Sequence, residues 1–125
     1  MQYAVFVDDK EITMDKIDGA RAFMEIVSGK VVRMWKYKRM FTPLEQEKKW
    51  PDQSEFIDDT CDFVFITGIF EVFGKVLVRS CPVDLADFDE DGNLVCCKYG
   101  EYDYLDDIHI AVNEMDTERL KEGDL

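Results

Sequence analysis

Acidic side chains dominate the segment 84–118, where residue types and spacing could form a binding or catalytic site. Between positions 84 and 118 there are twelve of them and a single basic residue, Lys98. Asp87, Asp89 and Asp91 precede Gly92 with the spacing of the first half of a calcium-binding EF-hand loop. The twelfth position of such a loop is a bidentate glutamate, but here it is Lys98, and the flanking sequence is typical of strands. We therefore expect an acidic hairpin turn and no metal site.

Two other patterns that could support catalysis are incomplete. His109 is the only histidine and lies between two isoleucines, so we expect it on a strand face and not in a cysteine–histidine pair or a zinc site. The segment 45–49 (Glu-x-Glu-Lys-Lys) resembles a fragment of metal-dependent nucleases. It lies between Pro43 and Pro51, however, where a loop or short helical turn is predicted. The sequence predicts neither an enzyme nor a cofactor.

The four cysteines are predicted to be reduced. Cys96 and Cys97 are adjacent, so in a strand they point to opposite faces and suit neither a shared disulfide nor a shared metal. The first residues lack the basic and long apolar parts of a signal peptide, and no apolar stretch is long enough to span a membrane. These features predict a cytoplasmic protein in which Cys61, Cys81, Cys96 and Cys97 are mostly packed as small apolar side chains.

The segment 30–41 combines five basic residues with Trp35 and Tyr37. Cations interleaved with aromatic rings are the pattern with which proteins bind single-stranded nucleic acid. The alternative is that Lys36 and Lys38 pair with acids on a neighbouring strand while Trp35 belongs to the core. The alternative is favoured because the net charge of the chain, −13, repels polyanions.

The charge of the chain is divided unevenly along its length. The first fifty residues carry ten basic and eight acidic side chains, whereas residues 51–125 carry five basic and twenty acidic ones. Such a balance disfavours binding to DNA or to an anionic membrane, since both need positive surface. Acidic residues that alternate in an extended segment lie about 6.6 Å apart on one side, so they could present a row of negative charges to a cationic partner. The alternative is a solvated acidic face.

Tyrosines among these acids add rigid contact area of the kind found at interfaces, although ordinary strand packing would also explain them. The predicted partner-binding residues are Asp84, Asp87, Asp89, Glu90, Asp91, Glu101, Tyr102, Asp103, Tyr104, Asp106 and Asp107.

Apolar periodicity predicts the elements that position these residues. Residues 63–73 and 75–80 are β-prone runs separated by a turn at Gly74, with a bulge at Gly68 and an end at Pro82. Further strands are predicted at 3–7, 30–41, 94–99 and 108–112, the last followed by a short helix capped by Asp116. Asp-Gly within 89–93 predicts a hairpin turn.

Apolar residues recur at helical spacing from Met14 to Val27, after Thr13 as a possible N-cap and before Gly29. The sequence therefore predicts a helix over 14–28. Together these elements predict a single α+β domain, 1–125, in which one antiparallel sheet of four to six strands has that helix packed on one face.

The composition favours a non-enzymatic inhibitor or interaction protein. It would occlude a basic, nucleic-acid-binding surface of another protein by presenting charges like those of a nucleic acid, as in a phage or mobile-element protein that blocks a host nuclease, or an immunity protein. We expect no direct binding to nucleic acid or membrane. The alternatives are a small nucleic-acid-binding module using 30–41 and a structural subunit of a larger assembly.

Overall fold

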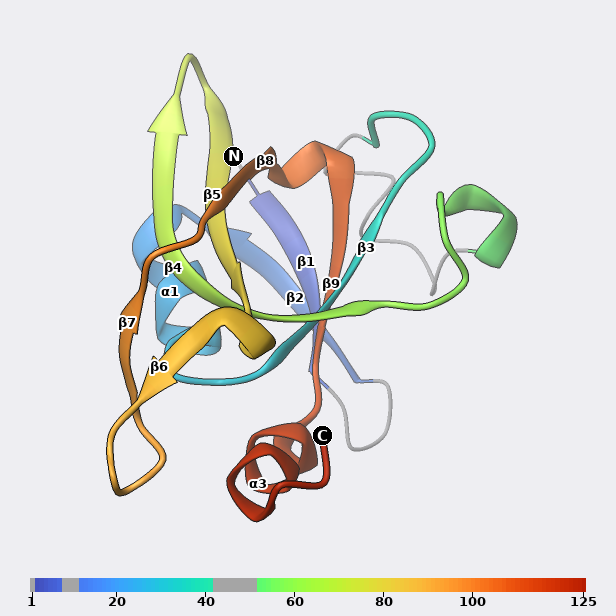
Figure 1. The fold of residues 1–125 in the computed structure, drawn as a ribbon. Helices are drawn as coiled ribbons and strands as arrows, with labels where there is room; N and C mark the ends of the chain where they lie inside the picture. Colours follow the sequence, from blue (N-terminus) through green and yellow to red (C-terminus); the bar gives the residue numbers. More distant parts are fainter. Residues whose placement is uncertain (1, 8–11, 42–51) are drawn as a thin grey trace.

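The computed structural model describes residues 2–7, 12–41 and 52–125. Two α-helices, three short 3₁₀ helices and nine strands form in this part of the chain (Figure 1). In chain order they are β1 (Gln2–Val7), β2 (Ile12–Asp18), α1 (Ala20–Val27), β3 (Val32–Lys36), η1 (Gln53–Glu55), β4 (Asp62–Val72), β5 (Lys75–Pro82), η2 (Val83–Leu85), β6 (Ala86–Phe88), β7 (Leu94–Cys97), β8 (Glu101–Tyr104), η3 (Leu105–Asp107), β9 (Ile108–Val112) and α3 (Glu114–Glu122).

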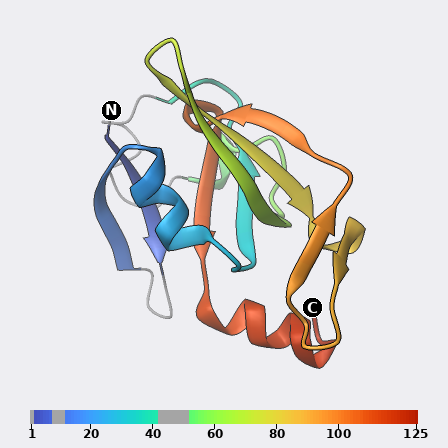
Figure 2. The same ribbon diagram turned by 90° about the vertical axis from the view of Figure 1, so that its left-hand side faces the viewer.

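One main sheet with a helix on it confirms the predicted α+β class. Its seven strands run in the order β2-β1-β9-β3-β4-β5-β8, and β6 and β7 form a separate two-stranded sheet. The main sheet has more strands than the four to six predicted, and it is mixed, because β1 pairs with β9 in parallel. The other neighbouring pairs are antiparallel. Figure 2 shows the β6–β7 hairpin beside the main sheet and above α3.

The first half of the predicted helix 14–28 is wrong, because the helix begins only at Ala20 and residues 12–18 form β2. Gly19 separates the two elements with a φ of 90°, a conformation that ends the strand and that residues with a side chain rarely adopt. Pairing with β1 gives the backbone of β2 its hydrogen-bond partners. The predicted end is confirmed, since Gly29 follows the helix with a φ of 68°.

The central hairpin agrees with its sequence signals. Phe73 and Gly74 both have positive φ, 50° and 74°, and join Val72 to Lys75 in the two-residue turn that suits twisted strands. The pairing register shifts between Ile66 and Gly68, so the bulge lies at the predicted place.

Three groups of buried side chains hold the elements together. The largest includes Phe23 and Val27 of α1, which lie against one face of the main sheet. A second surrounds Phe65, with Phe88 of the β6–β7 hairpin and Leu120 of α3 packed against it. The third is aromatic and contains Tyr37, Phe41 and Phe56, with Trp35 beside them.

The prediction that Asp116 caps the last helix is wrong. Asp116 instead anchors that helix to the sheet. The N-cap of α3 is Asn113, whose side-chain oxygen accepts a hydrogen bond from the backbone N–H of Met115 at 2.9 Å. Asp116 is 0% exposed and accepts two hydrogen bonds from the Arg33 guanidinium, at 2.7 and 2.9 Å. This bidentate pair fixes α3 to β3, so both charges are used inside the fold.

Candidate functional site

Five carboxylates lie exposed between the end of β5 and the start of β7. We call this segment, 84–93, the acidic hairpin; its exposed carboxylates are those of Asp84, Asp87, Asp89, Glu90 and Asp91. None of them forms a salt bridge with a cationic side chain in the described part of the chain. Their negative charge is therefore available to a partner, and its mutual repulsion is not relieved within the fold.

The tip of the acidic hairpin is built around Asp89. Its Oδ1 accepts hydrogen bonds from the backbone N–H groups of Asp91 and Asn93, both at 2.9 Å. Gly92 completes the turn with a φ of 80°. Because 89–93 is a turn and only Asp87 lies in a strand, the three aspartates do not form the straight row that an extended segment would give. Asp89 shapes the loop, and its neighbours present the charge.

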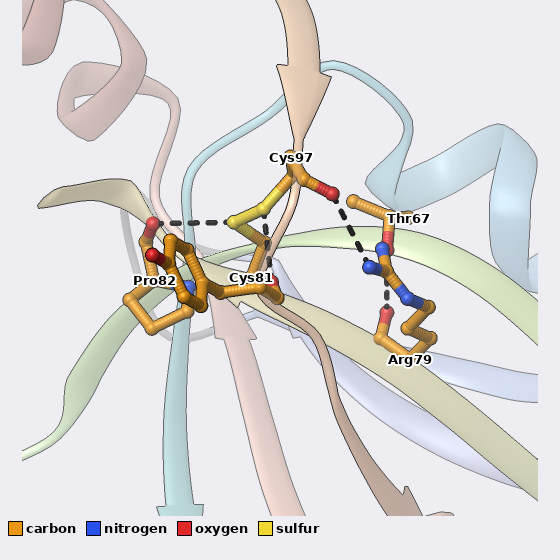
Figure 3. The surroundings of a disulfide bond; sticks show 6 residues. Thr67, Arg79, Cys81, Pro82 and Cys97 are labelled. Atoms are coloured by element: carbon orange, nitrogen blue, oxygen red, sulfur yellow. Dashed lines mark hydrogen bonds between the residues drawn. A yellow bond between two sulfur atoms is a disulfide. The ribbon is translucent and has the colours of Figure 1, made fainter. Parts of the chain in front are cut away.

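A disulfide joins β7, the strand that follows the acidic hairpin, to the main sheet, contrary to the prediction of reduced thiols. Cys81 of β5 and Cys97 of β7 are bonded, with their Cα atoms 6.3 Å apart (Figure 3). Cys61 and the exposed Cys96 are free. Adjacent cysteines do face opposite ways in β7, as expected, and that alternation turns Cys97 toward Cys81 while Cys96 faces outward. The sequence lacked any signal for the pairing of β7 with β5 in space.

Strand β8 contributes two of the predicted contact acids, but Lys36 partly neutralises both. The Lys36 Nζ lies 3.4 Å from Glu101 and 3.9 Å from Asp103. Asp103 pairs with the buried Val78 and is turned inward, with only 20% of its side chain exposed. Burial raises the pKa of Asp103 against the opposing influence of Lys36. Burial lowers the pKa of Lys36, but Asp103 and Glu101 more than compensate, so it is raised overall.

Exposed aromatic side chains lie on β8 and on the β4–β5 hairpin. Tyr102 and Tyr104 are exposed, and the Tyr102 ring lies 6.3 Å from that of Phe70 on β4. Phe73, at the tip of the same hairpin, is 100% exposed. Because the run 63–73 predicted buried strands, the exposure of Phe70 was missed. The exposure of Phe73 could have been predicted, since it lies beside the turn glycine Gly74.

The remaining predicted contact residues lie in η3 and do not extend the acidic hairpin. Asp106 is only 6% exposed, so the prediction that it contacts a partner directly is wrong, and Asp107 is half-buried. Backbone carbonyls of both residues accept hydrogen bonds from the segment after β3, at 2.7 and 2.9 Å. In both ribbon views η3 and the tip of the acidic hairpin lie at opposite ends of the molecule (Figures 1 and 2). The predicted set therefore does not form one continuous face.

Two of the five basic residues in segment 30–41, Arg33 and Lys36, form salt bridges within the fold. Arg33 binds Asp116 and Lys36 binds the acids of β8. Trp35 stacks against Phe56 with ring centroids 5.8 Å apart and also contacts His109. The alternative of internal pairing is met in part: Trp35 packs against the aromatic cluster and Lys36 pairs with acids, but those acids lie on β8, which is not next to β3. Lys38 is exposed and forms no salt bridge within the described residues.

His109 lies on strand β9, as predicted, inside the aromatic cluster. Its Nδ1 is 3.2 Å from the Tyr37 hydroxyl, and burial lowers the pKa of His109 to about 3. Burial also raises the pKa of Tyr37. The imidazole is therefore neutral at physiological pH and contributes to packing.

No group of three or more potential metal ligands comes together among the described residues. Within the predicted turn, the carboxylate of Asp89 accepts hydrogen bonds from the loop backbone. The nuclease-like segment 45–49 lies outside the described residues.

No family model, no curated protein and no solved structure matches the chain. Neither helix in the described part of the chain has the length and apolarity that crossing a membrane requires.

Proposed function

We propose that the protein is a non-enzymatic interaction protein that docks its acidic hairpin on a basic surface of another protein and blocks access to that surface. The observation that carries the proposal is the group of exposed carboxylates on 84–91 that form no salt bridge with any cation in the described residues. A basic surface that binds nucleic acid is a suitable target, because phosphates present charge of the same sign.

The acidic hairpin supports this proposal better than the other predicted contact residues do. It is connected to the main sheet by the disulfide and by the packing of Phe88 near Phe65, with ring centroids 5.6 Å apart. Preorganised charge loses less entropy on binding than charge on a free loop. Glu101 and Asp103 are less suitable because Lys36 already lies beside them.

The proposed partner is a nucleic-acid-processing protein, such as a host nuclease blocked by a phage or mobile-element protein, and the proposed place of action is the cytoplasm. The Cys81–Cys97 bond bears on that location, because disulfides seldom persist in the cytoplasm. Alkylation of thiols in acid-quenched cells would measure whether the bond is present where the protein acts. A disulfide found in such cells would contradict the cytoplasmic location.

The alternative of a nucleic-acid-binding module receives no support from the contacts of Arg33, Lys36 and Trp35 described above. A fluorescent single-stranded oligonucleotide tests it directly: binding at low salt that is lost on Lys38→Gln would favour the alternative.

The proposal is tested by purifying binding partners from the source cells with a neutralised hairpin, D84N/D87N/E90Q/D91N, beside the unchanged protein. Asp89 is kept because it forms the loop. Captured proteins are expected to be basic, to lose nucleic-acid binding in the complex, and to be released at high salt, since electrostatic association weakens with screening.

A matched control removes four exposed acids elsewhere, E25Q/D58N/D59N/D62N, and changes the net charge equally. It is expected to retain the partner. Partners that bind the neutralised hairpin as well as they bind the unchanged protein, or that are insensitive to salt, would overturn the proposal.

A further inference from the structure

A groove of about 500 Å³ lies between the end of α1, the bulged part of the β4–β5 hairpin, strand β7 and α3. Its size is typical of a small-molecule site. The residues around it include Arg79 and Lys121 but no aspartate or glutamate. This is unusual for a chain with 28 acidic residues. By contrast, a second groove of about 460 Å³ is lined by Asp62, Asp84 and Glu101.

Arg79 is held in place by neutral groups. Its Nη1 donates a hydrogen bond to the Thr67 hydroxyl at 2.6 Å, and its Nη2 donates one to the carbonyl of Cys97 at 3.2 Å (Figure 3). Gly100 lies so close that a Cβ there would overlap the guanidinium. The side chain is therefore fixed in position by β4, β7 and the backbone at residue 100.

The positive charge of Arg79 is not balanced within the fold. No carboxylate in the described part of the chain forms a salt bridge with Arg79 or with Lys121. A guanidinium has five N–H donors, and two of them are used in the contacts above. A half-buried arginine with spare donors, in a groove without acids, is suited to a carboxylate or phosphate.

The rest of the groove suits an apolar body. Met24, Phe65, Leu94 and Leu120 contribute to its wall, and Val95, which is 65% exposed, lies on its β7 side. Burial of an alkyl chain or small ring against these side chains would add hydrophobic stabilisation to the charge contact.

We propose that this groove binds a small molecule that carries one carboxylate or phosphate on an apolar body, with the anionic group on Arg79. This site shares Gly92 and Asn93 with the acidic hairpin, but its binding of a small molecule does not depend on the hairpin's proposed docking role. The Cys81–Cys97 bond links the two regions, because the carbonyl of Cys97 is one of the groups that hold Arg79.

The test is a titration followed by amide chemical shifts with four probes: octanoate, octyl phosphate, octanol and inorganic phosphate. At least one of the two amphiphilic anions is expected to shift amides at 66–67, 79 and 94–97, and to bind about tenfold or more tightly than octanol and inorganic phosphate. If only octanoate or only octyl phosphate binds, the result identifies which anionic group the site takes. Octanol binding as tightly as both anions, or no shifts at these amides with either anion, would overturn the proposal.

Variants at an exposed position separate charge from folding. Val95→Glu places an anion on the wall of the groove and is expected to weaken binding of the anionic probe about tenfold, whereas the matched Val95→Gln is expected to leave it nearly unchanged. Arg79→Gln is expected to abolish the preference over octanol. If Arg79→Gln does not fold, the Val95 pair decides, and equal binding by V95E and V95Q would refute the role of charge.

Discussion

The Cys81–Cys97 bond provides a quantitative test of how the acidic hairpin is held. The double substitution C81A/C97A removes the bond while keeping both positions small. The two cysteines are 16 residues apart, and closing a loop of that size stabilises a fold by ~3 kcal/mol through the entropy of the unfolded chain. We expect the free energy of unfolding to fall by about that amount and the Tm by roughly 10 °C.

Urea denaturation followed by far-ultraviolet circular dichroism, with and without dithiothreitol, measures the effect. The reductant should destabilise the unchanged protein and leave C81A/C97A unaffected. The control C61A/C96A removes the two free thiols, keeps the bond, and should respond to the reductant as the unchanged protein does.

The reasoning would be refuted by a difference below about 0.5 kcal/mol between C81A/C97A and the oxidised protein. Such a result would mean that hydrophobic contacts of Phe88 alone restrain the acidic hairpin. A larger loss of unfolding free energy in C61A/C96A than in C81A/C97A would mean that the disulfide had been assigned to the wrong pair of cysteines.

Three further outcomes are expected. Asp116→Asn removes the charge that holds Arg33, so urea denaturation should show a loss of about 2 to 3 kcal/mol, and a loss below about 1 kcal/mol would show that the pair contributes little. Phe73→Asn replaces an exposed phenylalanine at a φ of 50° before Gly74, and the Asn-Gly turn should raise the free energy of unfolding by about 0.5 to 1 kcal/mol, whereas a decrease would contradict the assigned turn. His109 has a pKa lowered by burial from 6.5 to about 3, so its contribution to stability is complete above pH 6.5 and falls as the pH decreases toward 3, by up to about 1 kcal/mol per pH unit; between pH 7 and 5.5 the free energy of unfolding of the His109→Phe variant should not show this decrease. An equal decrease in both proteins would mean that other groups cause it.

The parts of the fold that were predictable from the sequence are those fixed by local patterns. The β4–β5 hairpin combined two apolar runs with Gly74 and the bulge at Gly68, and each feature forms where the pattern placed it. The turn at 89–93 followed from Asp-Gly in the same way. In these segments, local conformation and tertiary pairing favour the same structure.

The helix expected at 14–28 shows why other elements were not predictable. Apolar residues separated by three and four positions satisfy a helix, but the pairing partner of 12–18 is β1, and periodicity carries no information about that partner. The conformation of Gly19 then confines the helix to the second half of the segment.

The candidate site was predictable in composition and not in arrangement. Counting charges identified 84–118 as acidic, and within it the carboxylates of 84–91 are exposed. The same count could not show that Lys36 lies beside Asp103, that Arg33 binds Asp116, or that Asp106 is buried, because each depends on contacts between distant parts of the chain.

The position of β9 has a consequence for synthesis. This strand lies between β1 and β3 in the main sheet, yet it is the last of the described strands to be made. Until residues 108–112 leave the ribosome, β1 and β2 have no hydrogen-bonded connection to the other strands. The sheet can therefore close only after β9 has been made, and until then the apolar β3–β5 segment is prone to aggregation unless chaperones or its own collapse shield it.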